Sequence, residues 1–187
     1  MIKTLYPCFQ HWSAKGSIYL ISDTHFDDPD CKLMDANWIT PEEHLKKLSF
    51  ITKNDTLIHL GDVGNPQYLT KLKCYKVLIM GNHDQSKTKF EPYFDEIYGG
   101  ALVIAPKIIL SHEPLDVTWA LNIHGHEHNN KYIYNRYHLN IASNLFGYNV
   151  LNLTEVIKVG FLSCIDDIHR QTIDFATAHS IKEIKNV

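Results

Sequence analysis

The sequence predicts an α/β or α+β sandwich, in which strands and helices alternate along the chain. Short apolar runs of strand length recur between segments that carry helix-start signals. Polar residues also gather where several of these runs end, and open α/β sheets bind ligands at the carboxyl ends of their strands. The pattern therefore predicts a binding edge together with the fold. We expect one domain over residues 1–187, with 1–16 as an N-terminal extension or edge segment.

The first half of the chain is expected to alternate strand and helix. Apolar runs typical of buried parallel strands predict three strands, over residues 17–22, 56–60 and 75–80. Between the first two runs, Thr40 and Glu43 have the spacing of a capping box, and Pro41 occupies the favoured first helical position. A helix over about 41–51 follows from these signals. Asn65 and Pro66 then begin another short helix before the third strand.

The second half is expected to contain a hairpin, a further strand and a helical tail. After a short helical stretch near 86–90, the runs ALVIA and KIILS flank Pro106 and predict the hairpin, and LNIH predicts the strand over 121–124. We expect residues 154–187 to pack helically and complete the sandwich, or to mediate self-association. Within this tail, four residues share a helical face: Ile165, Ile168, Thr172 and Phe175.

Composition excludes several classes of protein. Of the 187 residues, 44% are hydrophobic and 21% are charged, as in a globular domain. The longest apolar stretch, around residues 102–110, is interrupted by Pro106 and Lys107, so no membrane-spanning helix of roughly 20 apolar residues is expected. The N-terminal residues lack the apolar region and cleavage site of a secretory signal. These features predict a cytoplasmic protein that makes no membrane contact.

Cysteine, charge and histidine narrow the chemistry further. The four cysteines form no CxxC pair, which predicts reduced thiols rather than disulfides or a thiolate zinc site. A formal charge of -3 gives no overall electrostatic reason to bind a nucleic-acid backbone, so nucleic acid is a possible but unsupported partner. Histidine is the anomaly, because the chain has 12 of them and three lie in the short run 124–128.

Potential metal ligands follow five of the predicted strands. A single Asp or His at a strand end is usually a turn former, but the conjunction of five such places predicts a metal centre. In an extended backbone, residues i and i+2 point to the same side, whereas neighbours point apart. Each of two pairs could therefore present both donors to one ion: Asp23 with His25, and His126 with His128. Asn82 and His83 are neighbours, so we expect one of them to bind metal and the other to act in catalysis.

The number of donors is sufficient for two ions. One ion would use Asp23, His25 and His128, and a second would use Asn82, His112 and His126. Asp62, with two carboxylate oxygens, could bridge them. Two ions about 3.5 to 4 Å apart clamp an in-line phosphoryl displacement and acidify a shared water to hydroxide. Glycines precede these groups at positions 61, 81 and 125, where the backbone could turn sharply or approach an ion closely, although ordinary turns are the simpler explanation.

The order of the blocks DTH, GD, GNHD, SH and GHEH, within residues 22–128, resembles the calcineurin-like metallophosphoesterase superfamily. The segments LSHEP and NIHGHEHN are similar to small, single-domain prokaryotic and phage-type members. This resemblance implies a four-layer sandwich of two mixed β-sheets flanked by helices. It also implies a centre of two divalent metal ions and hydrolysis of phosphodiesters or phosphomonoesters. The ligands that it implies are those reached above by counting donors.

The resemblance also implies roles for residues near the metals. His83 would protonate the leaving oxygen, Asp84 would orient the His83 ring, and Asn82 with His83 would contact the substrate phosphate. We expect His124 to hydrogen-bond near the ligands rather than to bind metal, and His59 to be buried or to have a similar supporting role. The chain departs from the pattern at residues 27–28, because related small members often have Gly-His where this chain has Asp-Asp. Substrate contacts at that place are therefore expected to differ.

The leading hypothesis is hydrolysis of small-molecule or nucleotide phosphodiesters by a hydroxide that bridges the metals, with His83 as general acid. Phosphomonoesters are a further substrate class, and a nuclease or cyclic-nucleotide phosphodiesterase is the alternative within the same chemistry. Manganese is the first expectation for the metal, with iron, zinc or nickel also compatible with the mixed donors. Two alternatives are not enzymes. A binding scaffold resembling the retromer subunit would lack the catalytic histidine, and a metal-storage or sensing protein would not explain Asp84 beside His83. The sequence does not define an oligomeric state.

Overall fold

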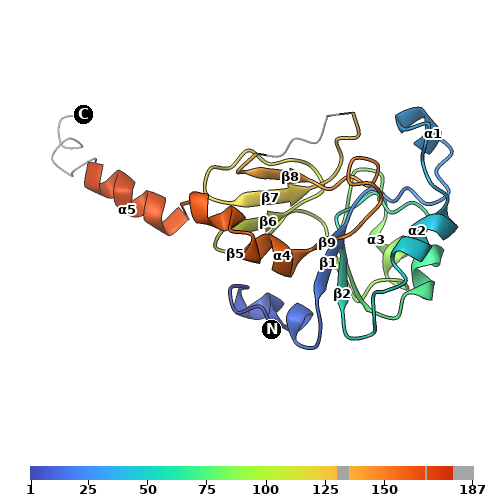
Figure 1. Cartoon of the computed structure of the whole chain (residues 1–187), viewed down its shortest axis with the longest axis horizontal. Coiled ribbons are helices and arrows are strands. Elements are labelled where there is room, and N and C mark those ends of the chain that lie inside the picture. Colours follow the sequence, from blue (N-terminus) through green and yellow to red (C-terminus); the bar gives the residue numbers. More distant parts are fainter. Residues whose placement is uncertain (130–134, 167, 179–187) are drawn as a thin grey trace.

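The computed structural model describes residues 1–129, 135–166 and 168–178. Its strands form two mixed sheets, and short helices flank them (Figure 1). The first sheet has the order β4 (Glu96–Tyr98), β3 (Tyr75–Ile79), β2 (Thr56–His59), β1 (Ile18–Ile21) and β9 (Leu151–Asn152). The second has the order β5 (Leu102–Ala105), β6 (Ile108–Leu110), β7 (Leu121–His124) and β8 (His138–Asn140). This architecture confirms the predicted fold class.

Each sheet contains one antiparallel pair within a parallel frame. In the first sheet β1 to β4 are parallel, and β9 runs antiparallel to β1. In the second, β6 to β8 are parallel, and β5 is antiparallel to β6 as the predicted hairpin requires. The parallel strands of a sheet direct their carboxyl ends to the same edge, so the loops that follow them meet there.

The main core lies between the two sheets. Leu20, Ile58 and Ile79 of the first sheet join Leu110 and Ile123 of the second in one buried cluster. The alternate side chains of the first sheet point the other way and pack against the helices on its outer face. Both faces of these central strands are therefore buried, which explains why their sequences are continuously apolar.

Three short helical segments cover the outer face of the first sheet: α2 (Pro41–Lys47), η2 (Pro66–Lys71) and α3 (Lys87–Phe90). The predicted capping box is present, because the Thr40 side chain accepts the Glu43 N–H and Glu43 accepts the Thr40 N–H. The helix is shorter than predicted. After Lys47 the backbone tightens into three-residue turns, in which the Ser49 N–H donates to the Lys46 carbonyl and the Ile51 N–H donates to the Leu48 carbonyl.

The N-terminal segment is more integrated than an extension. Residues Pro7–Ser13 form a 3-10 helix, η1, and Trp12 is buried in the core between the sheets. Its indole N–H donates to Glu96 of the edge strand β4 at 3.0 Å. The other elements that the sequence did not predict are short: α1 (Cys31–Met34) and strands β4, β8 and β9.

The C-terminal segment differs in part from the prediction. Helix α4 (Leu153–Lys158) and the 3-10 helix η3 (Phe161–Cys164) pack against the main core, whereas α5 (Ile168–Ala178) extends away from the sheets (Figure 1). The expected common face does not form, because Ile165 is buried before α5 begins and Ile168 is 53% exposed. The Phe175 side chain and residues 179–187 lie outside the described part. Among the described helices, none is long and apolar enough to cross a membrane.

Candidate metal centre

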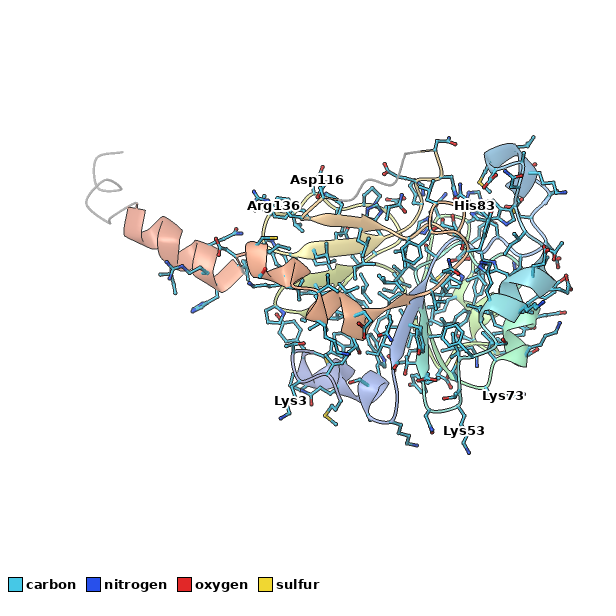
Figure 2. The ribbon with its side chains drawn as sticks, in the orientation of Figure 1. Lys3, Lys53, Lys73, His83, Asp116 and Arg136 are labelled. Carbon is cyan, nitrogen blue, oxygen red and sulfur yellow. The ribbon has the colours of Figure 1, made fainter. Side chains whose placement is uncertain are left out.

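The predicted ligands gather at the edge where the parallel strands of both sheets end. Asp23 follows β1 and Asp62 follows β2 in the first sheet, while His112 follows β6 and His126 follows β7 in the second. In Figure 2, His83 lies at the upper side of the molecule, and Lys3, Lys53 and Lys73 lie at the lower side. The edge that carries the candidate ligands therefore lies opposite the segments that carry these lysines.

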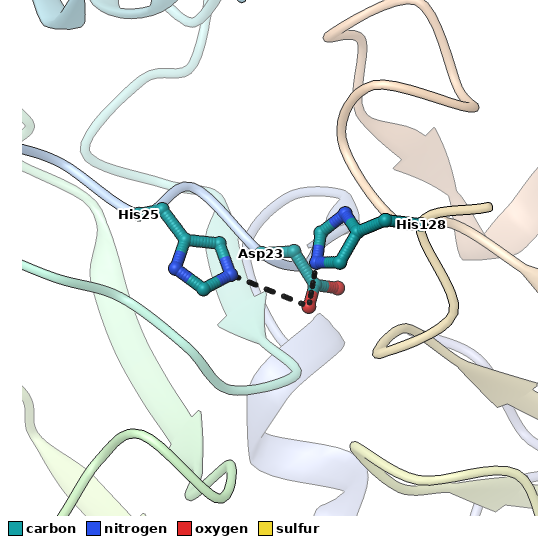
Figure 3. Close-up of side chains that lie close together, drawn as sticks. All are labelled: Asp23, His25 and His128. Atoms are coloured by element: carbon teal, nitrogen blue, oxygen red, sulfur yellow. Dashed lines mark ion pairs between the residues drawn. The ribbon is translucent and has the colours of Figure 1, made fainter. Parts of the chain in front are cut away.

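The first cluster consists of Asp23, His25 and His128 (Figure 3). One donor atom from each residue lies within 4.8 Å of the others. The Asp23 Oδ1 atom is 3.4 Å from His128 Nε2 and 4.0 Å from His25 Nε2. Atoms that bind one ion at about 2.0 to 2.2 Å lie roughly 3 to 4 Å apart, so this spacing suits a shared ion.

The second cluster consists of Asp62, His112 and His126. His112 Nε2 lies 3.2 Å from Asp62 Oδ2. The side-chain oxygen of Asn82 completes the group, because it is 2.8 Å from His112 Nε2 and 3.1 Å from His126 Nδ1. All seven residues that the sequence nominated as ligands thus lie in, or in direct contact with, the two clusters.

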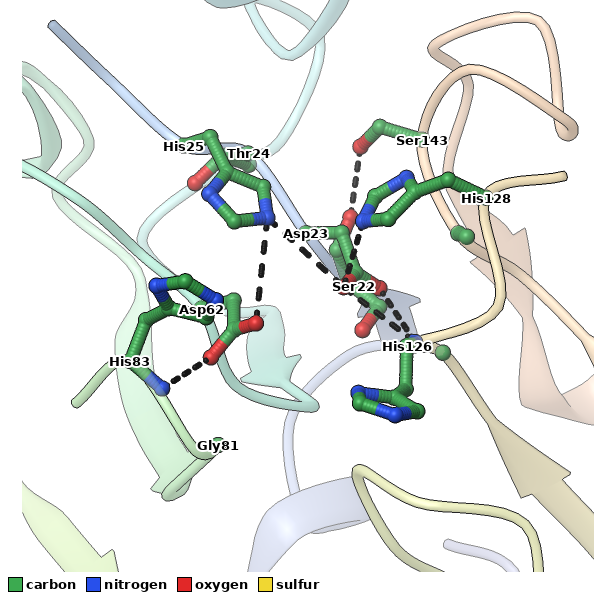
Figure 4. A network of polar contacts seen from close by, with 12 residues as sticks. Ser22, Asp23, Thr24, His25, Asp62, Gly81, His83, His126, His128 and Ser143 are labelled. Carbon is green, nitrogen blue, oxygen red and sulfur yellow. Dashed lines mark hydrogen bonds and ion pairs between the residues drawn. The ribbon is translucent and has the colours of Figure 1, made fainter. Parts of the chain in front are cut away.

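Asp62 joins the clusters through one oxygen. Its Oδ2 atom lies 3.2 Å from His112 Nε2 of the second cluster. The same atom is 3.7 Å from His25 Nε2 of the first cluster (Figure 4). Its Oδ1 atom accepts the backbone N–H of His83 at 2.9 Å. Oδ2 is thus the Asp62 oxygen that faces the two clusters, while Oδ1 is held by the backbone.

The ring nitrogens have the orientation that metal binding requires. Nδ1 of His25 pairs with Asp28, Nδ1 of His128 with Asn144, and Nδ1 of His112 with the Leu60 carbonyl, at 3.0, 2.9 and 2.8 Å. Each of these rings therefore directs Nε2 into its cluster. His25 Nε2 is buried and has no hydrogen-bond partner, which is costly unless an ion or water meets it. Imidazole, carboxylate and amide donors together suit divalent transition metals.

The electrostatics favour a cation at both clusters. Burial would raise the pKa of Asp23, but contacts with His128 and attraction to His112 outweigh this effect and hold the pKa below its ordinary value. Asp62 is also buried, and its pKa is likewise lowered, mainly by His112 and the His83 N–H. The pKa of His112 is raised in turn, because the two carboxylates outweigh its burial. Both carboxylates are thus kept anionic, which is the form that binds metal.

The backbone at the site differs from the expected extended geometry. Asp23, His25, Asp62 and His126 all have positive φ, between 41° and 69°, a conformation that non-glycine residues adopt rarely. His126 and His128 belong to different clusters and do not present both donors to one of them, whereas Asp23 and His25 share the first cluster. Such strain persists only when surrounding contacts hold it, and it is concentrated at functional sites.

Close packing explains two of the glycines that precede predicted ligands, Gly81 and Gly125. A Cβ added to Gly125 would collide with the carboxylate of Asp23 and the hydroxyl of Ser22. A Cβ added to Gly81 would collide with the Asp62 carboxylate. These two glycines are therefore needed because each ligand carboxylate lies directly against the backbone of another strand end.

His83 and Asp84 are placed differently from one another. The His83 side chain is exposed, and its ring lies edge-on to the His25 ring with 5.4 Å between centroids. Asp84 is buried, and its carboxylate accepts the N–H groups of Gly81, Asp62 and Val63. No hydrogen bond between the Asp84 carboxylate and the His83 ring is present within the described residues. The implied orienting role of Asp84 is thus replaced by support of the backbone.

His124 and His59 are both buried beside the centre. His124 Nδ1 pairs with the Gly125 carbonyl at 2.9 Å, and its ring packs edge-on against His138 rather than against a predicted ligand. His59 pairs through Nε2 with the Thr24 hydroxyl at 2.9 Å, and Thr24 lies between Asp23 and His25 in the chain. His59 thus has the supporting position that was expected, whereas His124 supports the turn at Gly125.

Sequence reasoning missed two partners of the clustered histidines, Asp28 and Asn144. The Asn144 Oδ1 atom accepts from His128 Nδ1 at 2.9 Å, and the Asn144 amide group donates to the His128 carbonyl at 3.1 Å. These contacts depend on how a loop after β8 folds over the site, and no periodicity signals them. Asp28 lies three residues after His25, a spacing that would have nominated it if the intervening turn had been known.

Comparisons with protein families and solved structures found proteins that this chain resembles. The model of one family, described as calcineurin-like phosphoesterase, matches residues 16–179. Among solved structures, the chain is similar to the protein of unknown function AQ665 from Aquifex aeolicus. The sequence identity is 26%, the TM-score is 0.62, and the match covers 76% of this chain and 98% of that chain. It is also similar to the nuclease MPE from Pseudomonas putida, with 22% identity, a TM-score of 0.44 and coverage of 62% and 63%. No curated protein matches the chain.

Proposed function

Because the chain belongs to the calcineurin-like phosphoesterase family, we propose that it is a metal-dependent phosphodiesterase whose two divalent ions are held by the two clusters. Family and clusters together support phosphoester hydrolysis at a dimetal site. The observation that carries the proposal is the position of Asp62 Oδ2, which lies 3.2 Å from His112 Nε2 and 3.7 Å from His25 Nε2. One carboxylate oxygen shared between two ligand sets is what a bridged pair of ions needs.

We assign Asp23, His25 and His128 to the first ion, and Asn82, His112 and His126 to the second, with Asp62 between them. When bound, two such ions supply an acidified water and positive charge for the oxygens of a transferring phosphoryl group. The protein holds the ligand atoms in place through contacts with its backbone. Asp23, for instance, is fixed by the His126 N–H, which lies 3.0 Å from Oδ2 and 3.2 Å from Oδ1.

His83 is assigned to the leaving group. Its backbone N–H is anchored on Asp62, so the ring stands beside the shared carboxylate while its side chain stays exposed to substrate. Asn82 and His83 are neighbours, and Asn82 contacts the second cluster while His83 contacts the ring of His25 in the first. A phosphate bound across both clusters would therefore meet the His83 imidazole at one side. Donation of a proton from that ring to the departing oxygen is general acid catalysis.

A preference for diesters is supported by the open surroundings of the centre. Only short segments join Asp84 to His112 and His112 to His126, and the described parts of these segments form α3 and strands β4 to β7 rather than a cap. A hollow of about 290 Å³ lies beside the second cluster and is lined by Asn82, His112, Gly99 and Gly100, among others. A diester has groups on both sides of its phosphorus, and an open site accommodates both of them, whereas a closed pocket would not.

Cys8, Cys31 and Cys74 are free thiols in the structure, which supports a reducing compartment such as the cytoplasm. We propose manganese as the working metal, because the mixed imidazole and oxygen donors accept it. A nuclease or cyclic-nucleotide phosphodiesterase is the narrower alternative, and a scaffold without catalysis is the alternative outside enzymes. The exposed His83 beside the clusters favours catalysis over the scaffold.

The test is a substrate panel with the purified full chain. We expect Mn²⁺-stimulated hydrolysis of bis(p-nitrophenyl) phosphate, abolished by chelator and restored by added metal. Cyclic nucleotides, single-stranded nucleic acid and p-nitrophenyl phosphate in the same assay rank the alternatives. Turnover of monoesters alone would overturn the diesterase proposal, and binding of two metals without any turnover would favour the scaffold.

A further inference from the structure

Asp28 is held on the far side of the His25 ring by a tight turn. The Asp28 N–H donates to the His25 carbonyl at 3.0 Å, and the left-handed φ of 62° at Asp27 allows the chain to reverse there. Asp28 Oδ1 accepts the Asp30 N–H at 2.9 Å, and Oδ2 lies 3.0 Å from His25 Nδ1. Both oxygens are therefore engaged, and the carboxylate cannot rotate freely away from the ring.

This contact determines which ring nitrogen faces the first cluster. A carboxylate accepts a hydrogen bond, so the proton of a neutral His25 ring resides on Nδ1 and the lone pair resides on Nε2. Nε2 is the buried atom without a partner, and it lies 4.0 Å from Asp23 Oδ1 and 3.7 Å from Asp62 Oδ2. The lone pair therefore points toward the two carboxylates of the proposed centre.

His25 also differs from the other clustered histidines in the charge of its partner. Within the described residues, Nδ1 of His128 is paired with the neutral amide of Asn144, and Nδ1 of His112 with the Leu60 carbonyl. Among the clustered histidines and the residues that the structure describes, only His25 has a carboxylate at the ring nitrogen that faces away from its cluster. An anionic acceptor fixes the tautomer more strongly than a neutral one and makes the opposite nitrogen a better metal donor.

We propose that Asp28 is a positioning residue for the first metal: it fixes the tautomer and orientation of His25 and thereby raises metal affinity at the first cluster alone. The proposal rests on the proposed function, because it takes His25 as a ligand. It gives a role to one of the two aspartates at positions 27–28, where the chain departs from the pattern it otherwise resembles. Asp27 has a different task, since its carboxylate bonds the Tyr68 hydroxyl and the Asn65 amide.

Asp27 is therefore a matched control for Asp28, with the same side chain at the next position. Metal affinity is measured by calorimetric titration of Mn²⁺ into full-length protein that has been stripped with chelator. Outer partners of ligand histidines are typically worth 10- to 100-fold in metal affinity. We expect Asp28→Ala to weaken one of two Mn²⁺ sites by about that factor, Asp28→Asn to weaken it less, and Asp27→Asn to change neither. The partial rescue by Asn arises because its Oδ1 can still accept from Nδ1.

The site that is weakened is identified by combining Asp28→Ala with His128→Ala, which removes a proposed ligand of the first cluster. Asp28→Ala should add no further loss to the site that remains. A second readout needs no metal: long-range ¹H–¹⁵N spectra of the stripped protein should show His25 protonated on Nδ1 in the wild type and as a mixture in Asp28→Ala.

Several results would overturn the proposal. They are an unchanged affinity in Asp28→Ala, an equal loss at both sites, an equal loss in Asp27→Asn, or the same His25 tautomer in both proteins. These outcomes differ from failure of the proposed function, which would appear as a wild-type protein that binds fewer than two Mn²⁺ ions or shows no phosphoesterase activity. Thermal unfolding of the stripped variants confirms that each one is folded.

Discussion

The carboxylate of Asp84 supports the backbone of Asp62, because its Oδ2 atom accepts the Asp62 N–H at 2.8 Å. The same oxygen accepts the Gly81 N–H at 3.0 Å, and Oδ1 accepts the Val63 N–H at 3.1 Å. Asp84 therefore connects the ends of β2 and β3 through hydrogen bonds. Through it, the left-handed turn that presents the shared carboxylate of Asp62 is held in place.

Replacing Asp84 with Ala should destabilise the metal-free protein. Three N–H groups would lose their acceptor, and a buried donor left unsatisfied costs about 1 to 3 kcal/mol. We expect the free energy of unfolding in urea, measured in chelator, to fall by roughly 2 to 4 kcal/mol. Asp95→Ala is the control, since its exposed carboxylate accepts only the Lys76 N–H, and its loss should be about 1 kcal/mol or less. Equal losses in the two variants would contradict this role.

The purified protein should carry about two divalent ions per chain after saturation with Mn²⁺. Asp62→Ala should weaken both sites, because one Asp62 oxygen faces both clusters, whereas His112→Ala should empty mainly the second. Elemental analysis and calorimetric titration measure the two effects. His11→Ala is the control, since that ring pairs with Glu96 at the start of β4, away from the clusters. A stoichiometry that stays at one, or equal losses from both cluster variants, would refute the assignment.

His83→Ala should leave both metals bound and reduce turnover. General acid catalysis is typically worth about 10² to 10⁴ in rate, so kcat for a nucleoside or alkyl leaving group should fall by that order. The defect should shrink for a p-nitrophenolate leaving group, which departs with little protonation. Parallel metal analysis separates this role from ligation. If metal is lost together with activity, or if every leaving group shows the same defect, His83 is not the general acid.

Gly125→Ala should damage the first cluster. The new methyl group would meet the Asp23 carboxylate and the Ser22 hydroxyl, and both are fully buried. Forcing extra atoms into a packed interior costs roughly 1 to 3 kcal/mol, so a lower melting temperature and weaker Mn²⁺ binding are expected. Gly100→Ala adds the same methyl group in open space and should change stability by about 0.5 kcal/mol or less. Indistinguishable behaviour of the two variants would mean that the close approach at Gly125 is not required.

Acid should destabilise the metal-free protein through His44. This ring is buried against Phe26 and Tyr148, and burial, with the nearby charge of Lys47, lowers its pKa from 6.5 to about 4. Between these two values the unfolded chain holds the extra proton, so stability falls as the pH drops from 6.5 toward 4 and this contribution levels off below. The total is about 3 kcal/mol at most. Urea midpoints for the wild type and His44→Leu should therefore diverge from pH 7 to 4.5, and parallel curves would exclude His44 as the group.

The strand positions could be predicted because their physical signal is strong. Central strands that are buried on both faces, such as β1 and β2, appear as largely apolar runs, and polar residues follow them directly. The strands β8 and β9 have only three and two residues, so no periodicity could reveal them. Trp12 was missed as a core residue because its burial depends on the packing of η1 against both sheets.

The grouping of the candidate ligands was also predictable, but the way the chain achieves it was not. Parallel strands deliver their following residues to one edge, which is a topological consequence and needs no side-chain detail. The positive φ at Asp23 and His126 depends instead on long-range contacts, such as the bond from the His126 N–H to the Asp23 carboxylate. The contacts of Asp84 were unpredictable for the same reason, since its oxygens accept three backbone N–H groups that follow two different strands, β2 and β3.

Each cluster draws its side chains from both halves of the sandwich. Asp23 and His25 follow the first sheet while His128 follows the second, and Asp62 faces His112 in the same way. An ion bound by such a set would link the two sheets, and it would require each ligand atom to lie within about 0.2 Å of its ideal distance. Buried residues such as Ile58 and Ile123 determine the spacing of the two sheets, and neither residue belongs to a cluster. Metal affinity in this protein should therefore depend also on the packing of the apolar side chains between the two sheets.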